Sequence, residues 1–522
     1  MEEERDFKGN LEDKGNINKI SEKKGDNKLL EQRKEYFGNW LINNSHLLII
    51  FILVLSSIVR IYYFYLTKDQ ALWWDEAEYL LKAKSIALGT PETGFWYGRP
   101  ILFPLLLSGF YFLGFGETAV RFSLLLVSVF SIYLVYLVGK QMFNEKVALI
   151  SSFLYSFVYI NLFYSMRIMN DVLTLTLGLL AFYFFFTGKR RLIWLVVPLL
   201  AINTLIRFPV FFFFIILVIY VAFTEKLSAL KNKNYWISLL LGGLIGGIYL
   251  YWSKIKFGDP LYAVKVAGGG AVSGTNIALG LSQIKQYLLT FPLYFQWVLL
   301  TAFILGLFLF TDVIFGFDLV LKNNNRKLSM KFFTLLWLII PILYFGFFVS
   351  HYEDRYIFMA FPAVFFIIGI SIFSIQALFI KYNKTLAVFV VVLILAFGSY
   401  QMIKTSDSII KSRIESFSPI KETGLWIKSN SNPEDKVMIR SHPQNTYYSE
   451  RASYSIPLEE ADFESNFSHI KPRYVIISVF DSPDPASGWW AYNINVEKYN
   501  LTFKNSFPKE NPAAIVYETN FD

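Results

Sequence analysis

The chain has 522 residues, 54% of them hydrophobic and 19% aromatic, with a formal net charge of +9 and no cysteine. Soluble domains average roughly 45–50% apolar residues even with glycine counted, so this composition excludes one large soluble core. The missing cysteines exclude disulfide bonds, thiolate metal sites and a cysteine nucleophile. Membrane proteins collect Lys and Arg in their cytoplasmic loops, which explains the positive charge without a nucleic-acid partner.

The chain begins with a charged segment, residues 1–44, before the first apolar run. Its first 34 residues are rich in charge and poor in aromatic side chains, a composition typical of disordered tails. A cleavable signal would need an apolar stretch close to the start, and this segment has none. We therefore predict a disordered cytoplasmic tail.

Apolar runs of about 17–25 residues recur from residue 45 to residue 403, the length that a helix needs to cross a bilayer. They lack the alternation of barrel strands, so they predict an all-α polytopic membrane protein in contact with the lipid bilayer. The eleven predicted spans are 46–66, 118–139, 147–163, 171–187, 191–206, 208–224, 235–253, 287–311, 332–349, 356–378 and 385–403.

One further apolar segment, Arg99–Gly114, decides the topology. It is short, and Pro100 and Pro104 disfavour a regular helix across it, so we predict that it lies in the membrane interface. The most basic loops then share one face with the N-terminal tail, and the positive-inside rule makes that face cytoplasmic. About eleven transmembrane helices result, with the first loop (67–117) and the C-terminus extracytoplasmic. We expect a multi-pass protein of the plasma membrane.

The composition changes at about residue 404, where Pro, Ser, Asn and charged residues return. Two segments, "KVMIRS" (436–441) and "RYVIISVF" (473–480), are short apolar runs next to polar and charged residues, a pattern typical of buried strands. We predict a small extracytoplasmic α/β domain over 404–522.

The first loop opens with "WWDEAEYLLKAKSIALG" (73–89), two tryptophans followed by three acids. A purely structural interpretation is available: Asp75 as a helix N-cap, Glu78 as its capping-box partner, and the tryptophans as part of an interfacial aromatic belt. That interpretation does not account for Glu76, nor for acids at a bilayer surface that favours cations.

Other ionisable residues are predicted on the same face. Asp171 opens the fourth span, Arg207 lies between two short spans, and "HYEDRY" (351–356) precedes the tenth span. Ionisable groups at membrane depth are costly and are functional candidates for that reason. Each of these residues, taken alone, can be explained by an ordinary structural role. Together, acids in one loop and arginines from three others predict a site for a phosphorylated substrate and a nucleophile to be activated.

These stretches resemble the GT-C glycosyltransferases, most closely the protein O-mannosyltransferases and the aminoarabinose transferases of lipid A. The resemblance covers most of 45–380 in order and spacing, and implies a GT-C transmembrane domain over 45–403 with a catalytic first loop. It is carried by "WWDEAEYL", "GRPILFPLLLSGFYFLGFGETAVRFS", "YSMRIMNDVL", "LIRFP" and "DRYIFMAFPA".

The resemblance also implies roles for single residues. It puts Asp75 and Glu76 at the catalytic centre, with Asp171 close by. The residues implied to contact the lipid phosphate of the donor are Arg99, Arg207, Arg355 and, beside the last of these, Tyr356.

Donors in this family are polyprenyl- or dolichyl-phosphate sugars. The resemblance therefore implies inverting transfer of a hexosyl or pentosyl group to a hydroxyl of a protein, lipid or glycan acceptor on the outer face. Asp75 would act as general base, and arginines would stabilise the departing phosphate. The chemistry requires no cofactor. His351 and Glu353, with Glu76 or Asp171, can supply nitrogen and oxygen ligands for a divalent metal.

Two other classes stay open. A transporter or lipid flippase without covalent chemistry would have charges near mid-bilayer, discontinuous helices and internal repeats. Here the charges gather at one face, and no repeat is visible. A non-catalytic partner of another glycosyltransferase would need the acids to be dispensable.

Overall fold

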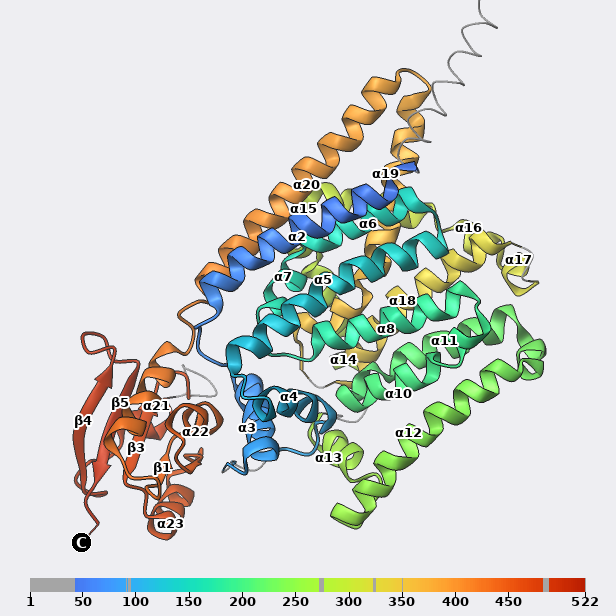
Figure 1. Ribbon diagram of the computed structural model, residues 1–522. Helices are drawn as coiled ribbons and strands as arrows, with labels where there is room; N and C mark the ends of the chain where they lie inside the picture. The colour runs from blue at the N-terminus through green and yellow to red at the C-terminus, as the bar shows by residue number, and fades with distance from the viewer. Residues whose placement is uncertain are drawn as a thin grey trace, which may run out of the picture.

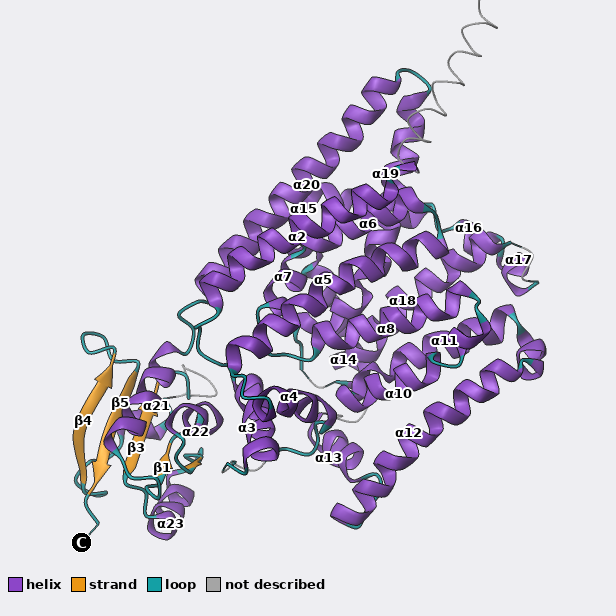
Figure 2. Cartoon of the chain, in the orientation of Figure 1, coloured by secondary structure: helices purple, strands orange, loops and turns teal. Residues whose placement is uncertain are grey.

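The computed structural model describes residues 43–90, 92, 95–271, 277–322, 325–349, 351–481 and 488–521. The predicted N-terminal tail therefore lies almost wholly outside the described residues. The described chain has a large helical part followed by a small α/β part, and every described strand belongs to the latter (Figure 2).

The helical part contains most of the chain. Its α-helices are α2 (Ser45–Thr67), α3 (Trp74–Leu88), α4 (Leu102–Phe112), α5 (Glu117–Met142), α6 (Glu145–Phe157), α7 (Tyr159–Ser165), α8 (Asp171–Thr187), α9 (Arg190–Ile193), α10 (Val196–Ile206), α11 (Phe212–Thr224), α12 (Lys233–Phe257), α13 (Tyr262–Ala271), α14 (Ile277–Leu289), α15 (Phe291–Phe308), α16 (Asp312–Phe315), α17 (Phe317–Leu321), α18 (Arg326–Phe348), α19 (Phe361–Ile380) and α20 (Lys384–Ser412). Its short 3₁₀ helices are η1 (Phe208–Phe211), η2 (Lys226–Lys231) and η3 (Asp354–Ala360).

All eleven predicted spans fall on helices, but not all of them are long enough to cross a bilayer by themselves. Among the described residues, seven helices meet the length and apolarity needed, and the pair α6 and α7, bent by 59°, raises the number to eight. The other predicted spans correspond to α8, α10 and the η1–α11 pair. These helices have no more than 17 residues each, about 26 Å, against a hydrocarbon core of about 30 Å. The chain is a multi-pass membrane protein, and its predicted count of eleven spans is not confirmed.

The connection from α2 to α5 carries α3 and α4, which pack against each other (Figure 1). We call the end of the helical part at which they lie the loop-one face. Helix α4 has 11 residues, about 17 Å, so it is too short to span, in agreement with the prediction for Arg99–Gly114. Pro104 lies in its first turn, where a missing N–H leaves no hydrogen bond unmade.

The α/β part begins after α20, which continues past the predicted boundary at residue 404 to Ser412. Its strand order is β2-β1-β3-β5-β4, with β1 parallel to β2 and β3, and β5 antiparallel to β3 and β4. The two predicted strands are β1 and β3. The elements are α21 (Ser418–Asn430), β1 (Val437–Met438), α22 (His442–Ser449), β2 (Ser453–Tyr454), α23 (Glu460–Ile470), β3 (Tyr474–Ser478), η5 (Trp490–Asn493), β4 (Leu501–Phe507) and β5 (Ala514–Thr519).

The α/β part packs on the first loop through α22, which contacts α3. The backbone N–H of Leu72 donates to the Tyr448 hydroxyl over 2.8 Å, and the hydroxyls of Tyr111 and Tyr447 are 3.1 Å apart. These contacts come just before α3 and from the end of α4. They therefore fix both helices of the loop against the C-terminal domain.

Candidate active site

A cavity of about 400 Å³ opens at the loop-one face. Its walls come from α3, the segment before α4, the start of η1, the end of α18 and the loop into η3. Five of the predicted site residues line it from four segments of the chain, together with the predicted metal ligands His351 and Glu353. The charged lining residues and those with hydroxyl, amide or imidazole groups are Asp75, Tyr79, Arg99, Asn170, Arg207, Tyr344, His351, Glu353, Arg355 and Tyr356.

The start of α3 explains why Asp75 can face this cavity. The helix begins at Trp74, and the carboxylate of Glu76 accepts the N–H of Trp73 over 2.8 Å. Glu76 therefore caps the helix, and the interpretation of Asp75 as the N-cap paired with Glu78 is wrong. Asp75 lies inside the first turn, where the helix dipole favours an acid, and its side chain is left for other contacts.

Two arginines hold the Asp75 carboxylate. Arg99 contacts Oδ1, and Nη2 of Arg355 donates to Oδ2 over 3.0 Å. Burial raises the pKa of Asp75, but the two guanidinium groups outweigh it and the net pKa is lowered. The carboxylate is thus ionised at neutral pH, and its side chain stays 18% exposed to the cavity. A proton acceptor must be both ionised and accessible to the hydroxyl that it deprotonates.

The arginines of the site are all paired with acids. Arg99 also contacts Glu78, and Arg355 also contacts Glu353. Burial raises the pKa of Glu78, a residue that the sequence interpretation took only as a capping partner. Burial acts in the same sense on Glu353, but the His351 hydrogen bond and Arg355 bring its pKa well below the usual range.

Asp171 lies behind the cavity wall and is fully buried. Its Oδ1 pairs with Arg207, whose Nη1 also donates to Asn170 Oδ1 over 3.1 Å. Its Oδ2 lies 3.8 Å from Nη1 of Arg355. Asp171 therefore connects two of the arginines that the resemblance assigns to the lipid phosphate.

Glu76 is fully buried and is not among the described residues that line the cavity. Its two oxygens accept from Arg121 (3.4 Å), Arg167 (3.2 Å) and the Ile168 N–H (2.7 Å), besides Trp73. These are the contacts of a positioning residue that ties α3 to α5 and to the chain before α8. The sequence interpretation did not single out Arg167, because nothing in its local pattern reveals a partner 91 residues away.

Glu76→Gln is expected to lower the free energy of unfolding by about 3–5 kcal/mol, the usual effect of removing one partner from a buried ion pair. Equilibrium unfolding in detergent micelles measures it. Glu117→Gln is the matched control, because Glu117 pairs with the same Arg121 but is 17% exposed. Equal losses in the two variants would contradict the role of Glu76 as a buried anchor.

The predicted metal ligands His351 and Glu353 do lie together. His351 Nε2 is 3.1 Å from Glu353 Oε1 and 2.7 Å from the Tyr356 hydroxyl. Within the described ranges, no three His, Asp or Glu side chains converge as a metal site would require. The divalent metal stays a prediction from the sequence, and Tyr356 enters the site through this hydrogen-bonded group.

A family model and a relative are similar to this chain in sequence. A family model described as dolichyl-phosphate-mannose-protein mannosyltransferase matches residues 98–252, which include Arg99, Asp171 and Arg207. An uncharacterised protein of Aquifex aeolicus (strain VF5) is 25% identical over 429 residues, covering 72% of this chain and 82% of the relative.

Solved structures are similar over most of the chain. ArnT from Cupriavidus metallidurans, bound to undecaprenyl phosphate, matches with a TM-score of 0.60 at 12% identity, covering 90% of this chain and 97% of that one. The oligosaccharyltransferase AglB from Archaeoglobus fulgidus, with an inhibitory peptide and a dolichol-phosphate, matches with 0.56 at 13% identity, covering 83% and 69%. The chain has the fold of the GT-C glycosyltransferases, as its sequence resemblance predicted.

Proposed function

We propose that this protein is a membrane glycosyltransferase that moves a sugar from a polyprenyl- or dolichyl-phosphate carrier to an acceptor hydroxyl. The observation that carries the proposal is an ionised carboxylate, Asp75, exposed in a cavity at one end of a membrane bundle and held between two arginines. The undecaprenyl phosphate in the ArnT structure and the dolichol-phosphate in the AglB structure support a lipid-phosphate donor.

The proposed reaction has one bond-forming and one bond-breaking event. The acceptor oxygen forms a bond to the anomeric carbon as that carbon's bond to the phosphate oxygen breaks. The acceptor proton moves to Asp75, and the lipid phosphate departs with the electron pair and one more negative charge. Arg355, with Arg207 or Arg99, stabilises that charge. Attack from the side opposite the phosphate inverts the anomeric configuration.

Donor binding also changes the base. A phosphate that contacts Arg99 and Arg355 brings negative charge beside the guanidinium groups that hold Asp75. That charge opposes the effect by which the two arginines lower the pKa of Asp75, while the burial that raises its pKa remains. Its proton affinity therefore increases when the donor is present, so that the base is strongest when it is needed.

The loop-one face is proposed to be extracytoplasmic. The opposite ends of the same helices carry the basic segments, among them Lys140 at the end of α5 and Arg326 at the start of α18. The positive-inside rule puts such ends in the cytoplasm. The catalytic cavity and the C-terminal domain would then face away from the cytosolic pool of nucleotide sugars.

The test is transfer in proteoliposomes that contain the purified protein. Membranes from the source strain lacking the gene supply the acceptor, and polyprenyl-phosphate sugars labelled in the hexose or pentose are the donors. We expect label in the acceptor with one of these donors and none with a nucleotide sugar alone. Transfer from a nucleotide sugar without lipid carrier would refute the donor class. Label that crosses the bilayer without any covalent product would favour a flippase.

A further inference from the structure

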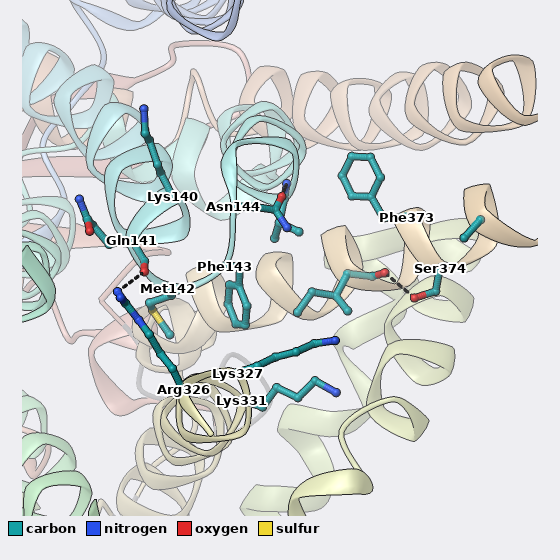
Figure 3. Close-up of a pocket in the computed structure, with 13 residues that line it drawn as sticks. Lys140, Gln141, Met142, Phe143, Asn144, Arg326, Lys327, Lys331, Phe373 and Ser374 are labelled. Carbon is teal, nitrogen blue, oxygen red and sulfur yellow. Dashed lines mark hydrogen bonds between the residues drawn. The ribbon is translucent and has the colours of Figure 1, made fainter. Parts of the chain in front are cut away.

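A second cavity, of about 770 Å³, lies at the end of the bundle opposite the loop-one face. It opens between the turn that joins α5 to α6, the start of α18 and the second half of α19 (Figure 3). Four cations line it: Lys140, Arg326, Lys327 and Lys331. No carboxylate is among the described lining residues, and Ile370 and Phe373 of α19 form an apolar wall.

This cavity is separate from the catalytic one. Helix α18 begins beside it at Arg326 and ends at Phe348, which lines the catalytic cavity. Its 23 residues correspond to a length of about 35 Å. No lining residue is shared between the two cavities in the described chain.

The placement of the cations on α18 is electrostatically unfavourable by itself. Arg326 and Lys327 occupy its first turn, at the positive end of the helix dipole, which favours anions. Lys327 and Lys331 are four residues apart, so like charges are neighbours on one helix face. In Figure 3 both lysine side chains extend in the same direction, away from the Arg326 side. A bound anion would relieve both conflicts.

Acids on the protein compensate only part of this charge. Lys331 is buried, and its ammonium donates to Asp312 and to the Leu309 carbonyl, while Lys140 pairs with Glu145. Arg326 donates to a neutral acceptor, the Gln141 carbonyl, over 3.1 Å. In the described part of the chain, neither Arg326 nor Lys327 has a carboxylate within ion-pair distance.

The positive-inside rule explains why cations occupy this face, but not why four of them surround one cavity. Other cations of the same face, such as Lys189 and Arg190 before and in α9, are exposed and line none of the cavities described here. The apolar wall beside the charges distinguishes the cavity further. A site that combines cations with apolar side chains at helix ends matches a phosphate headgroup joined to acyl chains.

We propose that this cavity binds the phosphate headgroup of a membrane lipid on the face opposite the catalytic site. Lys327 contacts the phosphate, Lys331 contributes charge from within the wall, and Arg326 adds positive charge to the same cavity. The apolar side chains of α19 contact the first part of the lipid tails. This proposal does not depend on the proposed transferase activity, because it is tested by lipid binding and not by sugar transfer.

The experiment measures lipid retained by the purified full-length protein in detergent, using native mass spectrometry with phosphatidic acid or phosphatidylcholine. We expect tighter retention of phosphatidic acid, and a loss of at least about tenfold in Arg326→Ala/Lys327→Ala. Lys189→Ala/Arg190→Ala removes the same charge from the same face and is the matched control. Its retention should equal that of the unmodified protein. If a thermal-shift assay shows that the double variant does not fold, Lys327→Gln alone replaces it, with a smaller expected loss of phosphatidic acid retention.

Inorganic phosphate at millimolar concentration separates two sources of the same chemistry. Little competition would support a lipid headgroup as the ligand. Full competition would keep a phosphate site but overturn its assignment to a lipid. Equal losses in the two double variants, or equal retention of the two lipids, would show only the diffuse charge of this face and would overturn the site.

Discussion

Asp75→Asn is expected to reduce sugar transfer by about 10²–10⁴-fold, the usual contribution of a general base. Asparagine keeps the size of the side chain, but its single oxygen can accept from only one of the two arginines, because Arg99 and Arg355 contact different oxygens of Asp75. It cannot take the acceptor proton. Because Glu76 caps α3, the substitution leaves the helix start intact. Donor affinity should be kept or improved, since one carboxylate no longer competes with the phosphate for the two arginines. Single-turnover transfer, with donor affinity measured separately, tests both expectations.

The control is Glu78→Gln, which removes a carboxylate from the same arginine, Arg99, without touching the proposed proton acceptor. It should lose far less activity than Asp75→Asn.

A pH profile of the unmodified enzyme adds a second readout, because activity falls as the pH drops through the pKa of the base. That pKa is lowered in the donor-free protein and rises when the phosphate binds beside the arginines. The acid limb of kcat should therefore lie at higher pH than that of kcat/KM. Near-normal transfer by Asp75→Asn would show that Asp75 is not the general base.

The helical part could be predicted because its signal is local. Runs of apolar residues mark the helices, and all eleven predicted segments fall on helices. The number of spans could not be predicted equally well. The span predicted over 191–206 ends where α10 ends, at Ile206, but it is broken at Trp194 and Leu195 into α9 and α10. The break leaves α10 with 11 residues, and the hydropathy of the run does not reveal it.

The site residues were predicted partly from topology and partly from the family resemblance. Asp75 and Arg355 are 280 residues apart, and the predicted topology placed both on one face before any family resemblance was considered. Arg99 is only 24 residues from Asp75 in the same loop, but it was assigned to the site through the resemblance alone. The structural interpretation of Asp75 as the N-cap was wrong, because the helix begins at Trp74, two residues earlier than a cap at Asp75 requires. The capping acid is therefore Glu76 and not Glu78.

Arg355→Ala is expected to lower kcat by about 10²–10³-fold, as when one donor to a developing negative charge is removed. It should also weaken donor binding by about 10–100-fold, since hydrogen bonds to charged groups contribute about 1.5–3 kcal/mol each. Both effects arise because this guanidinium would meet the phosphate before and during its departure, unlike Asp75, which acts on the acceptor. Its loss also leaves Asp75, Asp171 and Glu353 with one fewer cation, so the cavity becomes more negative and repels the phosphate.

Arg355→Lys separates charge from geometry. Lysine restores the positive charge but has no planar fork to contact two acids and a phosphate together, so intermediate values of kcat and donor affinity are expected. Arg413→Ala is the matched control. Arg413 lies over the Trp73 ring, with 6.0 Å between the guanidinium carbon and the ring centroid, and does not line the cavity. Its removal should leave donor affinity unchanged. Undiminished donor affinity in Arg355→Ala, on protein that a thermal-shift assay shows to be folded, would remove Arg355 from the phosphate site.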